Sequence, residues 1–167
     1  MKILVVDNDE VIRLLLDKVL GDNGHKTLLA ASGGEGISLF LAHQPDLVVC
    51  ELALPDMSGG DLAGQLKGFC LDRLLPVLFL TAIDDDQELS EGLDLGGDDF
   101  LEKPFNQNLL EAKLRAWERT LTLIRSWQKN PEGEPGLSEL GRSVLTGEEI
   151  AALMTGIARS SGPGDTP

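Results

Sequence analysis

Short apolar runs alternate with segments of helical pattern from the start of the chain to about residue 128, and this alternation constrains the fold more than any other feature. The apolar runs are ILVV at 3–6, TLLAA at 27–31, LVVCEL at 47–52 and PVLFLTA at 76–82, and a fifth, mixed strand-like run is DFLEK at 99–103. Helical segments are expected after Asp9, within 32–44, near 60–69, near 86–95 and from about 107 to 129. Five strand–helix units predict an α/β protein with a doubly wound, five-stranded parallel sheet that has helices on both faces.

The first helical segment carries its own start and stop signals. Asp9 can cap its N-terminus, because a carboxylate at that position accepts hydrogen bonds from free backbone N–H groups. The apolar residues that follow have helical spacing: Val11, Ile12, Leu15, Leu16 and Val19. Gly21 and Gly24 are expected to end the helix.

Charge and cysteine content exclude several function classes. The chain has 14 Lys and Arg residues against 28 Asp and Glu, a formal net charge of −14, so we expect no nucleic-acid partner. No apolar run approaches the roughly 20 residues of a membrane span, and no signal peptide is recognised, so we expect no membrane partner. Cys50 and Cys70 form no CxxC pair, which favours a reduced, cytoplasmic protein.

The composition changes near the end of the chain. Residues 131–167 hold seven Gly and four Pro, with two basic residues against six acidic ones. We therefore divide the chain into a domain at 1–125, whose last helix extends to about 129, and a Gly/Pro-rich acidic tail at 130–167. The segment 146–159 can form one short amphipathic helix in that tail.

Polar residues stand at the carboxyl ends of four expected strands. They are Asp7-Asn8-Asp9, Glu51, Thr81 and Lys103. In an open parallel sheet these ends lie at one edge, which is where α/β proteins bind ligands. Clustered carboxylates favour a hard cation such as Mg²⁺, and a lysine ammonium there can pair with a carboxylate or a phosphoryl oxygen. The residue types therefore indicate a site that handles phosphoryl groups.

Four stretches in order resemble the receiver domain of two-component response regulators, over about residues 1–125. They are KILVVDNDEVIRLLL, PDLVVCELALPDMSG, PVLFLTA and GGDDFLEKPF. The resemblance implies a flavodoxin-like (βα)5 fold and a bacterial, cytoplasmic signalling module without catalytic activity of its own. It implies protein partners, namely a histidine kinase or a downstream effector.

The resemblance also assigns roles to individual positions. The metal ligands would be Asp7, Asn8 and Glu51, and the phospho-acceptor position is Glu51. The residues that read the phosphoryl group would be Thr81, Ala82, Phe100, Lys103 and Pro104. The family pattern implies a cis peptide between Lys103 and Pro104, which an X-Pro bond tolerates. We expect Phe100 to be a core residue rather than a moving switch.

Two positions depart from the family pattern. The acceptor is Glu51 instead of aspartate, and the extra methylene moves the carboxylate by about 1.5 Å. Asn8 replaces one metal-binding acid, so Mg²⁺ binding should be weak or absent. We therefore predict a pseudo-receiver that works without phosphorylation, with Glu51 reaching Lys103. The alternative is a conventional Mg²⁺-dependent receiver in which Glu51 is a weak acceptor.

The last helical segment has a heptad seam, formed by Leu110, Leu114, Trp117, Leu121 and Ile124. Its first turns should cover the sheet, whereas its later turns, with Trp127, pass the expected domain edge. We expect this seam to form a homodimer or to contact a partner. The alternative is that the segment 148–159 folds back over it.

Two other function classes fit less well. Asp7 and Asp9 match the opening motif of haloacid-dehalogenase-type phosphatases, but Lys103 follows the acidic pair Asp98-Asp99 instead of preceding it. A DNA-binding regulator would need a helix-turn-helix or a basic patch after the domain, and the sequence has neither.

Overall fold

The computed structural model describes residues 1–82 and 86–129 and confirms the predicted order of elements. The strands are β1 (Lys2–Val6), β2 (Lys26–Ala30), β3 (Leu47–Cys50), β4 (Val77–Thr81) and β5 (Asp99–Glu102). The helices are α1 (Glu10–Asp22), α2 (Gly33–His43), α3 (Gly59–Gly68), α4 (Asp86–Leu95) and α5 (Gln107–Lys129). The acidic tail at 130–167 and the helix expected at 146–159 lie outside the described residues.

The element boundaries differ from the predicted ones by one or two residues. Strand β3 ends at Cys50, so Glu51 begins a loop and does not lie within the strand. Asp9 caps α1 as predicted, but Gly21 lies inside that helix, which continues to Asp22. Gly24 follows with a φ of +79°, a conformation that glycine adopts without steric cost.

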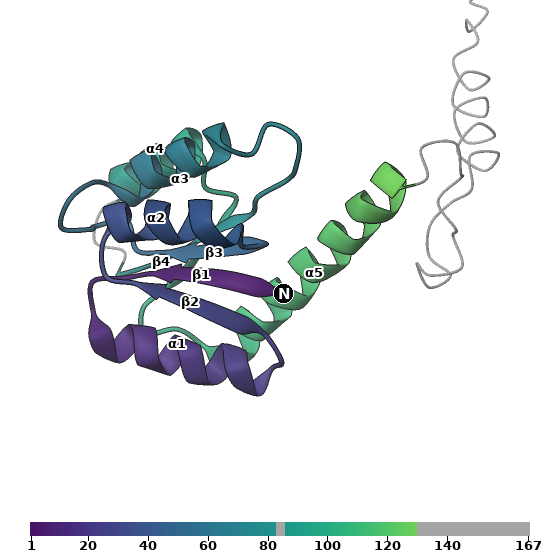
Figure 1. Ribbon diagram of the computed structural model, residues 1–167. Coiled ribbons are helices and arrows are strands. Elements are labelled where there is room, and N and C mark those ends of the chain that lie inside the picture. Colours follow the sequence, from purple (N-terminus) through teal and green to yellow (C-terminus); the bar gives the residue numbers. More distant parts are fainter. Residues whose placement is uncertain (83–85, 130–167) are drawn as a thin grey trace, which may run out of the picture. The chain divides into compact units, whose positions relative to one another are not determined.

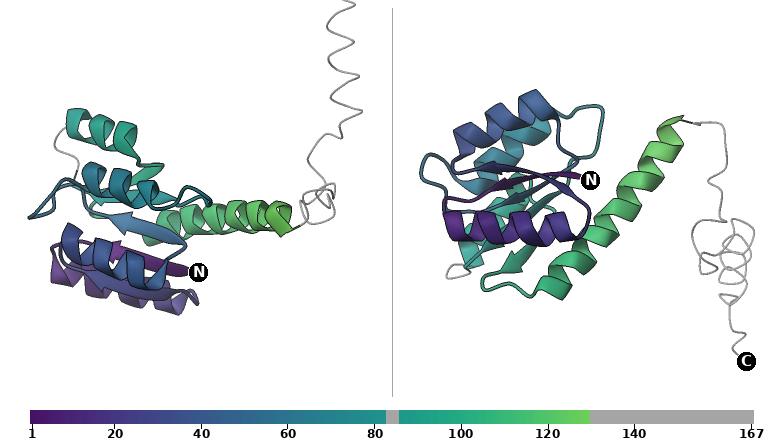
Figure 2. Two further views of the ribbon diagram at one scale, coloured as in Figure 1. Left: turned by 45° about the horizontal axis from the view of Figure 1, so that its top comes forward. Right: turned by 60° about the horizontal axis from the view of Figure 1, so that its bottom comes forward.

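All five strands run parallel, in the order β2-β1-β3-β4-β5, which confirms the doubly wound sheet (Figure 1). Helices α1 and α5 pack on one face, and helices α2, α3 and α4 pack on the other (Figure 2). Within the described residues, no helix is long and apolar enough to cross a lipid bilayer.

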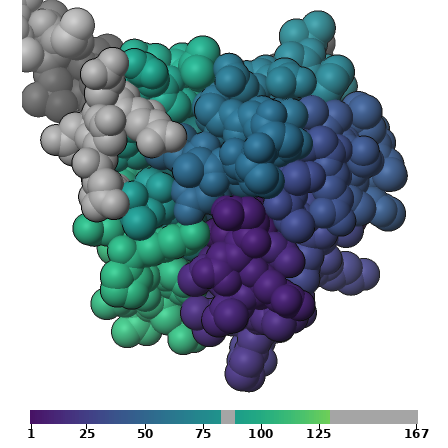
Figure 3. Space-filling model, turned by 90° about the vertical axis from the view of Figure 1, so that its left-hand side faces the viewer, coloured from purple at the N-terminus to yellow at the C-terminus, as the bar shows by residue number. Residues whose placement is uncertain are grey.

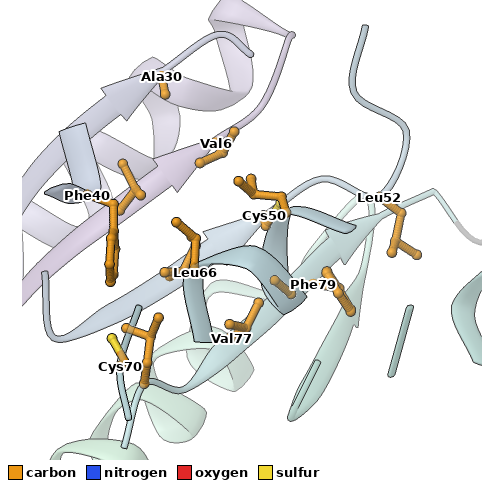
Figure 4. Packing of buried hydrophobic residues seen from close by; sticks show 14 of the residues in the cluster. Val6, Ala30, Phe40, Cys50, Leu52, Leu66, Cys70, Val77 and Phe79 are labelled. Carbon is orange, nitrogen blue, oxygen red and sulfur yellow. The ribbon is translucent and has the colours of Figure 1, made fainter. Parts of the chain in front are cut away.

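Strands β1, β3 and β4 are buried on both faces, which explains why their sequences are continuous apolar runs. In β1, Ile3 and Val5 join the cluster under α1 and α5, while Leu4 and Val6 join the cluster under the other helices. Figure 4 shows the second cluster, where Val6, Cys50 and Phe79 come from three neighbouring strands. Burial on both sides fixes the strand register, and with it the positions of the strand ends.

Gly59 is required where α3 begins against the end of β3. A Cβ at this position would lie 2.3 Å from the carbonyl oxygen of Glu51 and 2.8 Å from Cα of Leu52. Both of these are backbone atoms, so a larger residue would force the loop or the helix to move. Position 59 therefore limits which residues allow α3 to pack beside the acceptor position.

A Gly59→Ala variant should be less stable than the natural chain by about 1–3 kcal/mol, because the added methyl group overpacks the contact. Gly68→Ala is the matched control in the same helix, since no atom lies within 4 Å of its added Cβ. Urea denaturation followed by circular dichroism measures the free energy of unfolding of both variants. Equal stability of the two variants would contradict the steric argument.

Candidate functional site

The carboxyl ends of β1, β3, β4 and β5 meet at one edge of the parallel sheet, on the side of the molecule that Figure 3 faces. Backbone hydrogen bonds continue the parallel ladder past the strand ends: the amide of Glu51 donates to Val6 (2.9 Å), and that of Lys103 donates to Thr81 (2.8 Å). Asp7 continues β1 in the same way, with its amide 3.1 Å from the carbonyl oxygen of Ala30. The sheet itself therefore aligns the predicted site residues.

The structure brings Asp7, Glu51 and Lys103 into direct contact. The Lys103 Nζ atom lies 2.6 Å from Asp7 Oδ2 and 2.6 Å from Glu51 Oε2. Both carboxylates are buried, with 2% of Asp7 and 8% of Glu51 exposed. Burial alone would lower the pKa of Lys103, but the hydrogen bonds and charges of the two carboxylates outweigh burial and raise it. Lys103 is therefore a cation at neutral pH.

Backbone amides bind the remaining oxygens of the two carboxylates. Asp7 Oδ1 accepts a hydrogen bond from the amide of Asp9 (2.8 Å). Glu51 Oε1 accepts hydrogen bonds from the amides of Leu52 (2.7 Å) and Ala53 (3.3 Å). Each carboxylate oxygen thus has a donor, which is how a buried charge is tolerated. The longer side chain of Glu51 reaches Lys103, as predicted.

The arrangement does not fit a resident Mg²⁺ ion. Mg²⁺ needs a near-octahedral set of oxygen ligands, whereas one oxygen of each carboxylate already faces the Lys103 ammonium group. Asn8, the expected additional ligand, is exposed. Over residues 1–82 and 86–129, no cluster of three His, Cys, Asp or Glu side chains is arranged to hold a metal ion.

The other predicted residues lie around this ion-pair cluster. Thr81 is buried at the end of β4, and Ala82 after it is exposed. The peptide between Lys103 and Pro104 is cis, as predicted. Phe100 lies on β5, three residues before Lys103, and its position differs from the predicted one.

Phe100 is not a core residue, contrary to expectation. Its side chain is 38% exposed, whereas the next residue, Leu101, is buried. The physical reason is that β5 is an edge strand, so one of its faces packs on the sheet helices and the other is open. Phe100 lines an open pocket of about 400 Å³ together with Pro104 and Leu109.

The structure divides the predicted seam on α5. Leu110 and Leu114 are buried in the core cluster between the sheet and helices α1 and α5, as expected for the first turns. Leu121 is buried as well, whereas the later turns were expected to be exposed. Trp117 is partly buried against the same cluster. The heptad spacing is therefore explained largely by the packing of α5 on its own sheet. Ile124 is partly buried and Trp127 is 55% exposed.

Asp9 does not face Asp7 as an acid–base partner. Its carboxylate accepts hydrogen bonds from the amides of Val11 (2.8 Å) and Ile12 (3.5 Å), as a helix cap does. This geometry gives no support to the phosphatase alternative. The Arg13 guanidinium, which the sequence pattern did not single out, donates to the carbonyl oxygen of Asp7 (2.6 Å) and helps to hold the end of β1.

The thiol next to the acceptor position is not a nucleophile. Cys50 is buried, and its Sγ atom lies 3.1 Å from the carbonyl oxygen of Glu51. Burial, followed by the negative charges of Glu51 and Asp7, raises the pKa of this thiol strongly. It therefore stays protonated, and thiolate chemistry is not available at this edge.

Comparisons with known proteins agree on one family. A family model described as the response regulator receiver domain matches residues 3–115. Response regulator MprA of Mycolicibacterium vanbaalenii is 40% identical over 122 residues, which are 73% of this chain and 52% of that protein. The probable transcriptional regulator ycf27 of Porphyridium aerugineum is 36% identical over 178 aligned residues, covering 97% of this chain and 72% of that protein.

A solved structure shows the same relationship. The crystal structure of a two-component response regulator from Clostridium difficile is 32% identical and superposes with a TM-score of 0.67, covering 71% of this chain and 96% of that one. The chain spans about half the length of MprA, so part of that curated relative has no counterpart in this sequence.

Proposed function

The chain belongs to the response regulator receiver domain family of two-component signalling, and we propose that it is an atypical member that works without phosphorylation of Glu51. One observation carries the proposal: the Lys103 ammonium group already binds the carboxylates of Glu51 and Asp7, each at 2.6 Å. In an ordinary receiver, the family resemblance assigns this lysine to the phosphoryl group. Here Glu51 supplies a negative charge 2.6 Å from the lysine.

The charges explain why the cluster favours one conformation. Two buried carboxylates repel each other unless a cation joins them, and Lys103 supplies that cation from within the chain. Receiver domains generally bind Mg²⁺ at this edge, and we propose that this chain binds it weakly. An incoming Mg²⁺ ion would have to displace Lys103 from the two carboxylates, and position 8 offers it a neutral amide instead of a third carboxylate.

We further propose that the module signals through protein contacts, with a histidine kinase or a downstream effector as the partner. The contact surface would lie on α4, β5 and α5, where Phe100 and Leu109 line the open pocket of about 400 Å³. A homodimer through α5 remains part of this proposal. It would have to use exposed side chains such as Trp127, because three leucines of the predicted seam are buried.

The proposal is tested with Mg²⁺ and beryllofluoride, which mimics a phosphoryl group on the acceptor carboxylate of a receiver. We expect the amide NMR signals of Asp7, Glu51, Thr81 and Phe100 in the full chain to stay unchanged, because Lys103 occupies the carboxylates. Mg²⁺ alone and fluoride alone are the controls. Saturable shifts at these residues would support the alternative of a conventional receiver with Glu51 as a weak acceptor.

A further inference from the structure

Residues 51–58, which we call the acceptor loop, follow β3 and connect the ion-pair cluster to the start of α3. At its near end, the amides of Leu52 and Ala53 bind Glu51 Oε1. The loop closes on itself through a bridge between Ala53 and Ser58. The bridge therefore couples the far end of the loop to Ala53, one of the two residues whose amides hold the Glu51 carboxylate.

The far end of the acceptor loop is attached to a different helix. Asp56 Oδ1 accepts a hydrogen bond from the amide of Gly33 (2.9 Å), and Asp56 Oδ2 accepts one from the amide of Gly34 (2.8 Å). These amides belong to the first turn of α2, whose free N–H groups attract a carboxylate. Asp56 is exposed, and the bonds from Gly34 and Gly33 lower the pKa of its carboxyl group.

Packing reinforces this attachment. The side chain of Met57 lies directly against Gly33, where an added Cβ would be 2.5 Å from Met57 Cγ. Helix α2 already has its own cap, because Ser32 Oγ accepts a hydrogen bond from the amide of Glu35 (3.3 Å). The contact with Asp56 is thus an additional link between α2 and the acceptor loop.

We propose that Asp56 is a positioning residue, which ties the acceptor loop to α2 and so keeps the Leu52 and Ala53 amides on Glu51 and the Glu51 carboxylate on Lys103. The inference rests on the proposed function, because it assigns Asp56 a part in holding the phosphate-independent arrangement. Asp56 itself touches neither Glu51 nor Lys103 through a hydrogen bond; it acts through the four residues that connect it to Glu51.

The test compares Asp56→Ala and Asp56→Asn with Ser32→Ala in the full chain. Ser32→Ala is the matched control, since it removes a cap from the same helix end and leaves the acceptor loop attached. The readouts are the ¹³C shift of the Glu51 carboxyl carbon and the exchange rate of the Leu52 amide. A general loss of stability would change both readouts in Ser32→Ala as well, so only a change confined to the Asp56 variants supports the inference.

In Asp56→Ala we expect the Glu51 carboxyl signal to shift and the Leu52 amide to exchange about fivefold faster, the factor that corresponds to losing one typical hydrogen bond that holds the loop. In Asp56→Asn both readouts should lie between those of Asp56→Ala and the natural chain, because the amide oxygen of asparagine can still accept one hydrogen bond. In Ser32→Ala both readouts should match those of the natural chain. The inference is overturned if the Gly33 and Gly34 amides move in Asp56→Ala while Glu51 and Leu52 do not. This outcome is independent of beryllofluoride binding, so it can be told apart from a failure of the proposed function.

Discussion

A Glu51→Asp variant should accept a phosphoryl group from acetyl phosphate in the presence of Mg²⁺ about 100-fold faster than the natural chain, the scale expected when a reacting group is misplaced by about 1 Å. Shortening the side chain withdraws the carboxylate by about 1.5 Å. This breaks the 2.6 Å contact with Lys103 and leaves room between the carboxylates and the ammonium group. Intact-protein mass spectrometry measures the gain of one phosphoryl group.

The control for this prediction is Glu51→Gln, which also weakens the ion pair but offers no carboxylate to phosphorylate. The double variant Asn8→Asp, Glu51→Asp should be labelled at lower Mg²⁺ concentration than Glu51→Asp alone, since it adds a third negative charge for the metal. Rapid labelling of the natural chain, with no gain in Glu51→Asp, would contradict the assignment of the defect to the added methylene.

A Lys103→Met variant should be less stable than the natural chain by about 3–5 kcal/mol, because it leaves two buried carboxylates without their cation. Urea denaturation at neutral pH measures this loss. Lys113→Met is the matched control: Lys113 pairs with Asp99 at 2.7 Å, but both side chains are partly exposed, so its loss should cost about 1 kcal/mol or less.

The double variant Lys103→Met, Glu51→Gln should lose less stability than the sum of the two single changes, because it removes one of the uncompensated charges together with the cation. Additive losses would show that the Glu51–Lys103 contact contributes nothing to folding.

The same contact makes stability depend on pH. Folding raises the pKa of Lys103 above its ordinary value of 10.5, so its contribution is fully present below that pH. The contribution is lost as the pH rises through the higher pKa of the folded state. Lys103→Met should therefore remove part of the alkaline decline in stability, which denaturation curves at a series of pH values would reveal.

The positions of Asp7, Glu51 and Thr81 followed from the sequence alone, because each comes at or just after the end of a buried strand. Lys103 follows the half-exposed strand β5, which the alternation of strands and helices predicted. A continuous apolar run is a local property that marks such a strand, and parallel strands bring their carboxyl ends to one edge. The reach of Glu51 to Lys103 could be predicted for the same reason, since it depends on side-chain length and strand order.

Only the tertiary structure decided which side chains of α5 and β5 are buried and which are exposed. The spacing of Trp117 and Leu121 fits either a seam between two helices or a helix packed on its own sheet, and only the fold shows that Leu121 is buried and Trp117 is partly buried. Phe100 is exposed because β5 lies at the edge of the sheet, which no local pattern specifies.

The backbone amides that bind Glu51 and Asp56 could not be predicted from the sequence. Every residue except proline carries a backbone N–H group, so the sequence does not mark which amides a carboxylate will meet. Asp56 reaches α2 across 22 and 23 residues of chain, a link that exists only after the loop and the helix pack together. Local periodicity determined the sheet and the place of the site, whereas contacts between distant segments determined what holds Glu51 there.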